Sequence, residues 1–227
     1  MIRKLPILAV VAALVGYMQP GGAQPRPAPS SQTSPDEAER LGKLAAKLSG
    51  EGRFQEAAPL AEQSLAIWEK AFGPKHPKVA ESLRSLAWLY AAQGAYAKAE
   101  PLLARALDTY EKALGPVHPE VATCLDSLAK LYQMQGAYGK AEPFLLRAIE
   151  IRKKTLGAMH PDTARSLNDL AALYQAQGDY ARAEPLLVRA LDIREQALGA
   201  MHPDVAISLD KLATLYQELG VDGGEFP

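Results

Sequence analysis

Apolar residues recur along the chain at helical spacing and return in the same order in each of several repeat units. From Leu83 the pattern continues at Leu86, Ala87 and Tyr90, three, four and seven residues further on, which is the spacing of one stripe along an α-helix. The same residue types fill these columns in each later unit: Leu125, Leu128, Ala129 and Tyr132; Leu167, Leu170, Ala171 and Tyr174; Leu209, Leu212, Ala213 and Tyr216. We expect this stripe to form the buried core, because the small alanine lets a partner helix approach closely.

Proline and glycine mark the helix boundaries. Each unit begins with the dipeptide His-Pro, at His76, His118, His160 and His202, with a constant period of 42. Proline suits the first position of a helix, and glycine is typical just past a helix end. First helices are predicted to end near Gly94, Gly136, Gly178 and Gly220, and second helices to run from Tyr96, Tyr138 and Tyr180 to Gly115, Gly157 and Gly199. The second helices carry their own apolar columns: Ala99, Ala141 and Ala183; Leu103, Leu145 and Leu187; Ala106, Ala148 and Ala190.

These signals divide the chain into helical hairpins over residues 36–73, 76–115, 118–157 and 160–199, followed by a final single helix over 203–219. The first hairpin diverges from the others in sequence. A fixed period of this length is typical of stacked repeats, in which each unit buries its apolar face against its neighbours. The predicted fold class is therefore all-α, an α-solenoid of stacked helical hairpins.

Residues 1–23 have the pattern of a secretory signal peptide. Arg3 and Lys4 precede an apolar run from Ile7 to Met18, and small residues lead up to Ala23. That run is much shorter than the roughly 20 residues that a membrane-spanning helix needs. We predict cleavage after Ala23 and export to a periplasmic or extracellular location. An uncleaved N-terminal anchor is the alternative.

Two further segments lack a helical pattern. Residues 24–35 are rich in proline, serine and glutamine and are predicted to be a disordered linker. Residues 221–227 are predicted to be a disordered tail. The predicted repeat array between them, residues 36–220, is thus the part of the chain expected to fold.

The charge of the chain argues against nucleic acid and anionic membrane surfaces as partners. Lysine and arginine number 25 against 26 aspartate and glutamate, and no block of like charge is present. The exported chain would still lie close to neutrality, since cleavage removes only Arg3 and Lys4 from the charged residues.

Few residues suggest chemistry. The histidines of successive repeats are separated by whole hairpins, too far to share a metal ion, and we interpret them as turn or cap residues. Cys124 stands in a column of serines and is interpreted as a small packing residue. No nucleophile with a base, and no glycine-rich phosphate loop, is present, so we expect no enzyme, no metal and no cofactor. The recurring glutamate of Ala-Glu-Pro, at Glu100, Glu142 and Glu184, is interpreted as a helix-start or surface charge.

The recurring columns Leu, Leu-Ala, Tyr, Gly, Tyr, Ala, Leu and Ala resemble the tetratricopeptide repeat. The period of 42, with HPDVA, LAxLYxxQGxYxxAEPLxxRAL and a closing Leu-Gly, is similar to the longer variant found in kinesin light chains and many bacterial proteins. The resemblance extends from Asp36 to Gly220. It implies a solenoid with a right-handed superhelical twist, whose first helices line a concave groove that holds an extended peptide or a helix of a partner.

A second stripe of the first helices varies from repeat to repeat. Its columns are Glu81, Thr123, Arg165 and Ile207; Arg84, Asp126, Asn168 and Asp210; Trp88, Lys130, Ala172 and Thr214; Ala92, Met134, Ala176 and Glu218. One interpretation is a solvated face that is free to drift, and the other is a binding surface, which the resemblance places in the groove. The candidate partner-binding residues are Arg84, Trp88, Asp126, Lys130, Arg165, Asn168 and Asp169.

The resemblance is incomplete at the groove. Kinesin-light-chain-like repeats tend to place asparagine at the positions where this chain has Arg84-Ser85, Asp126-Ser127, Asn168-Asp169 and Asp210-Lys211, and only Asn168 matches. A more charged set of contacts is expected instead. The leading hypothesis is a non-enzymatic scaffold that binds a protein or peptide in this groove, and the alternative is an assembly module that self-associates through its terminal repeats.

Overall fold

The computed structural model describes residues 34–220. The predicted signal peptide, most of the predicted linker and the predicted tail lie outside these residues and stay predictions. Within 34–220 the chain forms nine helices and no strand. None of these helices combines the length and the hydropathy that crossing a membrane requires.

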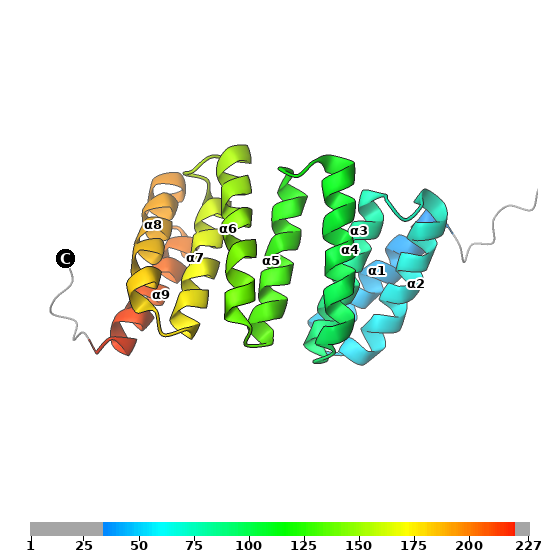
Figure 1. Ribbon diagram of the computed structural model, residues 1–227, viewed down its shortest axis with the longest axis horizontal. Coiled ribbons are helices and arrows are strands. Elements are labelled where there is room, and N and C mark those ends of the chain that lie inside the picture. Colours follow the sequence, from blue (N-terminus) through cyan, green and yellow to red (C-terminus); the bar gives the residue numbers. More distant parts are fainter. Residues whose placement is uncertain (1–33, 221–227) are drawn as a thin grey trace, which may run out of the picture. The chain divides into compact units, whose positions relative to one another are not determined.

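The helices follow one another with short connections. Their bounds are α1 Pro35–Gly50, α2 Phe54–Phe72, α3 Pro77–Ala92, α4 Tyr96–Leu114, α5 Pro119–Met134, α6 Tyr138–Thr155, α7 Pro161–Ala176, α8 Tyr180–Leu198 and α9 Pro203–Glu218. The four hairpins are α1 with α2, α3 with α4, α5 with α6 and α7 with α8, and α9 packs against α8 (Figure 1). Each hairpin otherwise contacts mainly the hairpins before and after it. The predicted all-α solenoid is confirmed.

Histidine caps the first helices, as predicted. The Nδ1 atoms of His76, His118, His160 and His202 each accept a hydrogen bond from the backbone N–H two residues further on, at 3.1 to 3.2 Å. This bond satisfies one of the N–H groups that the start of a helix leaves without a partner. Glycine ends the helices because the chain must turn through the left-handed region there, with φ of 74° at Gly94 and 92° at Gly115.

Helix α1 begins earlier than predicted. Its first residue is Pro35, which had been assigned to the linker, and the side chain of Ser34 accepts a hydrogen bond of 3.3 Å from the N–H of Glu37. Serine as the cap followed by proline at the first helical position is the same start signal that His-Pro supplies elsewhere. The divergent first repeat therefore uses a different capping residue for the same purpose.

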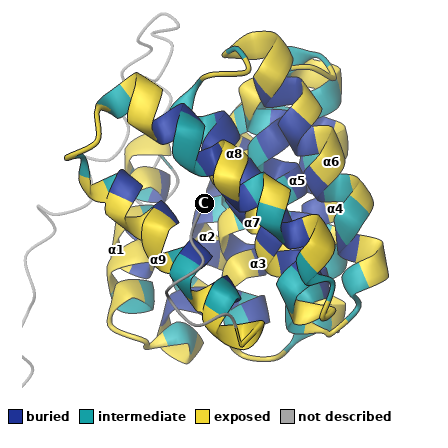
Figure 2. Cartoon of the chain, turned by 90° about the vertical axis from the view of Figure 1, so that its left-hand side faces the viewer, coloured by how far each residue is buried: buried dark blue, intermediate teal, exposed yellow. Residues whose placement is uncertain are grey.

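The invariant columns form the core. Leu83 and Leu125 are fully buried, Leu167 is 7% exposed, and the alanines of the first-helix and second-helix columns from Ala87 to Ala190 are inaccessible. Figure 2 shows the buried residues on the sides of the helices that face one another. In α9, Leu209 is 50% exposed and Ala213 is only partly buried, because within the described residues no helix follows α9. The predicted core stripe is confirmed for the repeats that have neighbours on both sides.

Tyrosine and glutamate link successive hairpins. The hydroxyls of Tyr132, Tyr174 and Tyr216 each donate a hydrogen bond of 2.8 Å to the glutamate of the preceding second helix, Glu100, Glu142 and Glu184 respectively. These partly exposed glutamates are interpreted from the sequence as helix-start or surface charges, which leaves out their bonds to tyrosine. The glutamate is invariant because it accepts from the equally invariant tyrosine of the next hairpin. In the first repeat Glu62, one turn further along α2, accepts from Tyr90 instead.

Candidate functional site

A groove of about 970 Å³ runs across the first helices of the hairpins. Its lining residues come chiefly from α1, α3, α5 and α7, with a few small or apolar residues of α2 and α4 at its floor. This follows from the hairpin geometry, since the invariant stripe of each first helix faces the core and leaves the variable stripe on the concave side. The groove that the family resemblance implied is therefore present in the described residues.

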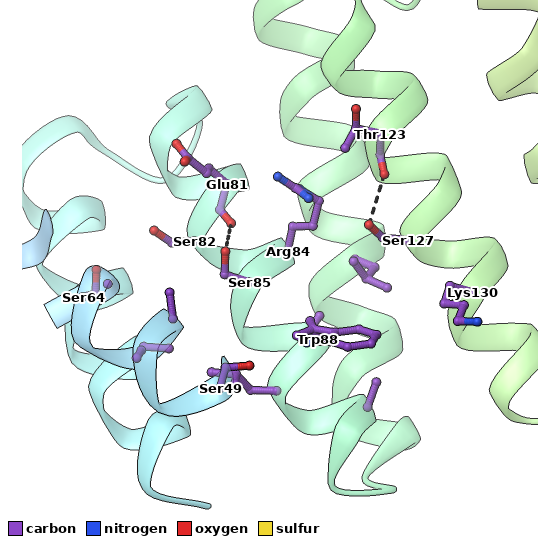
Figure 3. Close-up of a pocket in the computed structure, with 18 of the residues that line it drawn as sticks. Ser49, Ser64, Glu81, Ser82, Arg84, Ser85, Trp88, Thr123, Ser127 and Lys130 are labelled. Atoms are coloured by element: carbon purple, nitrogen blue, oxygen red, sulfur yellow. Dashed lines mark hydrogen bonds between the residues drawn. The ribbon is translucent and has the colours of Figure 1, made fainter. Parts of the chain in front are cut away.

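The end of the groove nearest α1 is smooth and electrically balanced. Gly42, Ala46 and Ser49 of α1 and Ser82 and Ser85 of α3 line it with small side chains. Its charges are paired along their own helices, Lys43 with Glu39 at 2.6 Å and Lys78 with Glu81 at 2.9 Å. Serine hydroxyls bond back to the helix, as Ser85 does to the carbonyl of Glu81 at 3.0 Å (Figure 3). This end thus offers space rather than charge.

The other end of the groove is charged and carries an aromatic side chain. Trp88 of α3 is 48% exposed and extends across the groove toward Lys130 of α5 (Figure 3). Lys130 and Asp169 are both exposed and make no ion pair with any other residue of 34–220. Arg165 is held by Asp162 at 3.4 Å. An exposed tryptophan beside charges without partners is the composition of a protein-binding surface.

Six of the seven predicted site residues line this groove: Arg84, Trp88, Asp126, Lys130, Arg165 and Asp169. Asn168 does not, and its assignment to the groove is wrong. Its side chain is only 2% exposed and lies in the junction between hairpins, where neither its oxygen nor its nitrogen has a hydrogen-bond partner in the described residues. The members of this column differ in environment, since Arg84 and Asp126 line the groove and Asp210 is exposed, whereas Asn168 is buried.

Asp126, which occupies the same column, is held by a buried arginine. Arg152 of α6 is 3% exposed and donates to both carboxylate oxygens of Asp126, at 3.2 and 2.5 Å. It also donates to the hydroxyl of Ser166 on α7 at 2.5 Å. One guanidinium therefore joins α5, α6 and α7, and it fixes the position of a carboxylate that lines the groove.

The junction one repeat later has the arginine without the carboxylate. Arg194 of α8 is 7% exposed and donates to the hydroxyl of Ser208 and to the carbonyl of Asp204. Asn168 stands at the place of Asp126 and makes no bond to Arg194, whose Nε atom is also without a partner in 34–220. Sequence reasoning missed both arginines. The signal was present, because Arg152 and Arg194 occupy one column of the repeat and the serine that each contacts stands at the same offset from it.

The junction one repeat earlier has its arginine, Arg84, in the column of Asp126 instead of on the second helix. Tyr110 stands in the arginine column and Cys124 in the serine column, and both are buried. Burial raises the pKa of the Tyr110 hydroxyl and of the Cys124 thiol, each to about 12, against the opposing positive charge of Arg84. A buried thiol with so high a pKa is unreactive at neutral pH, which agrees with its interpretation as a packing residue.

Asp169 is an acid of the groove whose pKa is raised. Its carboxylate is open to solvent along the groove, yet the concave surface surrounds it with protein. This desolvation raises its pKa, and the negative charge of Asp126 raises it further, while Arg165 and Lys211 oppose the shift. The groove therefore holds two neighbouring acids, one neutralised by Arg152 and one available to a ligand.

The described residues offer no metal site, since no cluster of three histidine, cysteine or carboxylate side chains occurs in 34–220. The capping histidines stand one to each hairpin start. The groove itself offers a concave surface, the exposed ring of Trp88 and the charges of Lys130 and Asp169.

Comparison with known proteins identifies the architecture. The sequence model described as "Tetratricopeptide repeat" matches residues 36–112, 90–154, 131–196 and 162–220. Nearly identical TPR-like repeats of a kinesin light chain from Podosopora anserina share 33% identity and a TM-score of 0.71, over 82% of this chain and 89% of that one. BtubC (BKLC) from P. vanneervenii shares 26% identity and a TM-score of 0.71, over 82% and 74%.

More distant structures share the fold alone. A Rap protein in complex with competence and sporulation factor is 18% identical, with a TM-score of 0.65, over 81% of this chain and 49% of that one. No curated protein sequence matches the chain.

Proposed function

Because the chain belongs to the tetratricopeptide repeat family, with repeats like those of kinesin light chains, we propose that it is a scaffold that binds a segment of a partner protein in the groove of its first helices. Tetratricopeptide repeat proteins are generally non-enzymatic scaffolds for protein–protein interaction. The finer assignment, to this groove and to these residues, is our proposal.

The observation that carries the proposal is the contrast between the two ends of the groove. The half-exposed Trp88 lines the groove together with Lys130 and Asp169, which have no ion-pair partners in 34–220, while Glu39 and Lys43, the charged residues of α1 that line it, pair with each other. A solvated face under no constraint would not be expected to keep a large aromatic side chain exposed in a concavity. A partner segment would stack on Trp88 and meet both charges, which favours one orientation of the segment.

The fold is compatible with a bound partner in at least one distant relative. The Rap protein described above was solved with competence and sporulation factor. That complex concerns the Rap protein, and it lends only general support to binding by the present chain.

A photoreactive amino acid at position 88 would test the groove. We expect light-dependent crosslinks to one partner, identified by mass spectrometry, and no crosslink to it from position 188. Val188 on α8 is the matched control, since it is 47% exposed against 48% for Trp88 but lies outside the groove.

A triple variant gives the complementary measurement. Replacing Trp88, Lys130 and Asp169 by alanine changes only exposed side chains, so helical circular dichroism should be retained while crosslinking or pull-down of the partner is lost. Undiminished capture by a folded triple variant would refute the groove assignment.

A second candidate function is self-association through the terminal repeat. Ile207 and Leu209 of α9 are each 50% exposed, and Leu209 stands in a column that the interior repeats bury. Sedimentation velocity of the chain at increasing concentration would reveal a dimer. A hundredfold range of protein concentration changes the chemical potential of the chain by about 2.7 kcal/mol. A sedimentation coefficient that stays constant over this range would argue against self-association.

We also propose that the chain is exported, on the basis of the pattern in residues 1–23. N-terminal sequencing of the protein recovered from the cell envelope or the medium would test this. A mature chain that begins at Gln24 is the expected result, and one that begins at Met1 would exclude cleavage.

A further inference from the structure

Helix α9 exposes a stripe that every preceding first helix of its type buries. Ala80, Ala122 and Ala164 are inaccessible, whereas Ala206 in the same column is exposed. Leu209 is 50% exposed in a column whose other members reach at most 7%. The residues themselves have not changed toward polar types, although a repeat that ends a stack usually acquires a polar outer face.

The interior repeats show what covers this stripe. Each first helix packs along its length against the second helix of its own hairpin. In the second hairpin the side chains of Ala80 and Leu83 share one buried cluster with Ala106 and Tyr110 of α4. The stripe on α9 is therefore shaped for a second helix, which no segment of residues 34–220 supplies.

A charge beside the stripe points to the same missing helix. Arg105 of α4 pairs with Glu69 of α2 at 2.6 Å, and Arg147 of α6 pairs with Glu111 of α4 at 2.5 Å. Each of these second helices thus places an arginine on a glutamate of the second helix before it. Glu195 of α8 stands in the same column as these glutamates, is exposed, and has no ion pair within the described part of the chain.

The arginine–glutamate ion pair between second helices is absent between α6 and α8. Lys153 replaces the glutamate on α6, and Arg189 of α8 pairs instead with Asp192 of its own helix at 2.5 Å. Glu195 restores the acidic residue at the next position. Glu195 therefore offers a negative charge to the arginine that a further second helix would carry. The two charges would be complementary.

The chain sequence after Gly220 does not repeat the pattern. In the register of the repeats, residues 222–227 align with residues 180–185, and Glu225 stands where Ala99, Ala141 and Ala183 stand in the second helices. The expected alanine at the helix–helix contact is thus a glutamate.

We infer that α9 and Glu195 form a docking site for an amphipathic helix of another polypeptide, which takes the place of a second helix. The chemistry of that helix follows from α4, α6 and α8: an alanine, a leucine four residues later, an arginine six residues later and an alanine seven residues later, as in Ala183, Leu187, Arg189 and Ala190. This site lies on the end of the stack and is separate from the groove.

A second copy of the chain fits this site less well than such a helix. The second-helix stripes that match this site are themselves buried in the folded chain, where Ala99 and Ala183 are inaccessible and Leu187 is 1% exposed. The exposed helix α9 of a second copy does not match, because Asp210 and Leu212 stand where the pattern requires leucine and arginine. A second copy would have to open a hairpin before it could supply a matching stripe. The complementary helix must therefore be one whose apolar stripe is not already buried within its own protein.

A labelled peptide with the sequence of residues 179–199 serves as the probe, since it carries the full stripe and Arg189. We expect saturable binding to the full chain by fluorescence anisotropy. Leu209→Asp should weaken it by about tenfold or more, because a carboxylate would be buried against the peptide. Ile207→Asp is the matched control, since Ile207 is equally exposed but lies in the groove-facing column, and it should bind as the unmodified chain does.

A charge exchange tests the register. Glu195→Lys should weaken binding of the peptide, and a peptide with Arg189→Glu should restore it toward the original affinity. A peptide with the sequence of the first helix α7, residues 161–177, should not bind. Equal binding to the Leu209→Asp chain, or no rescue by the exchanged peptide, would overturn the inference.

Two further outcomes separate this inference from the proposed functions. The triple variant at Trp88, Lys130 and Asp169 should bind the peptide normally, so failure of the groove assignment leaves this site untouched. A dimer of the chain alone that Leu209→Asp abolishes would instead identify a second copy as the occupant and overturn the inference.

Discussion

The junction built around Asp126 and the junction built around Asn168 occupy equivalent places in successive repeats but differ in how their polar groups are satisfied. In the first, Arg152 joins Asp126 and Ser166, and both members of the ion pair have partners. In the second, Arg194 keeps its serine but faces an amide that makes no bond within 34–220. A change from carboxylate to carboxamide thus converts a complete network into an incomplete one.

This difference shows that repeats of one architecture need not be equally stable. A buried cation is costly unless a counter-charge and hydrogen bonds compensate it, and an unpaired buried amide adds a further cost. In a stack whose stability is a sum of units and neighbour contacts, the weaker junction lowers the stability of its own end. We expect the α7–α9 end to open before the centre of the stack does.

The largest expected effect comes from breaking the complete network. Asp126→Ala leaves Arg152 buried without a counter-charge and should lower the free energy of unfolding by about 3–5 kcal/mol. Urea denaturation followed by circular dichroism measures it. Asp210→Ala is the matched control in the same column, where the side chain is exposed, and should change stability by less than about 0.5 kcal/mol. Equal effects of the two changes would contradict the role given to Arg152.

Repairing the incomplete network should have a smaller effect of opposite sign. Asn168→Asp offers Arg194 the carboxylate that Arg152 already has and should raise the free energy of unfolding by about 1–2 kcal/mol. Amide hydrogen exchange should slow most in α7 to α9. Asn168→Leu, which removes both unpaired polar atoms, should be neutral or mildly stabilising. A loss of stability in Asn168→Asp would show that the amide has a partner in solution.

The tyrosine links should not distinguish the two junctions. Tyr132→Phe and Tyr174→Phe each remove a hydrogen bond of 2.8 Å to a glutamate, and each should cost about 1 kcal/mol. Thermal denaturation of the two variants measures the loss of stability that each substitution causes. Costs that differ by more than the error of measurement would mean that the junctions differ in more than their arginine partners.

The smallest effect concerns Asp169, whose raised pKa depends in part on the charge of Asp126. Because its pKa is raised in the folded chain, Asp169 contributes stability that is present below its ordinary value of 3.8 and is lost as pH rises through the folded pKa. Asp169→Asn should therefore stabilise the chain at pH 7 by less than about 0.5 kcal/mol, since the group is exposed, and should give no gain at pH 3. A gain that persists at pH 3 would point to another cause.

The fold followed from the sequence because packing imposes the same requirement in every repeat. Leu83, Leu125 and Leu167 fill one environment three times, so a single column identifies both the helix face and its burial. The cap at His118 and the turn at Gly115 were equally readable, since each meets a local backbone requirement. Features that depend on one helix, or on one turn, were predicted with their boundaries almost unchanged.

The polar contacts between hairpins were harder to predict because they involve two columns at once. Asn168 was assigned to the groove because its column varies from repeat to repeat. The column of the buried arginines varies in the same way, with Tyr110 in one repeat and Arg152 and Arg194 in the next two, so variation alone does not identify a groove position. Glu142 was assigned to the surface because a single invariant carboxylate does not identify its partner. In both cases the sequence holds the information in pairs of columns separated by a helix, and reading columns singly does not recover it.

The links between Tyr132 and Glu100, and between Tyr174 and Glu142, have a mechanical consequence. Each of these hydrogen bonds joins only adjacent hairpins, and hairpins further apart have few contacts. The resistance of the stack to bending is therefore a sum of similar and independent contributions, one from each junction between hairpins. A load applied to the groove is shared among them as small rotations, and no single hinge is needed. The radius of the groove is then an elastic variable, set by the stiffness of the junctions, and the softer junction at Asn168 takes up the largest share of any deformation.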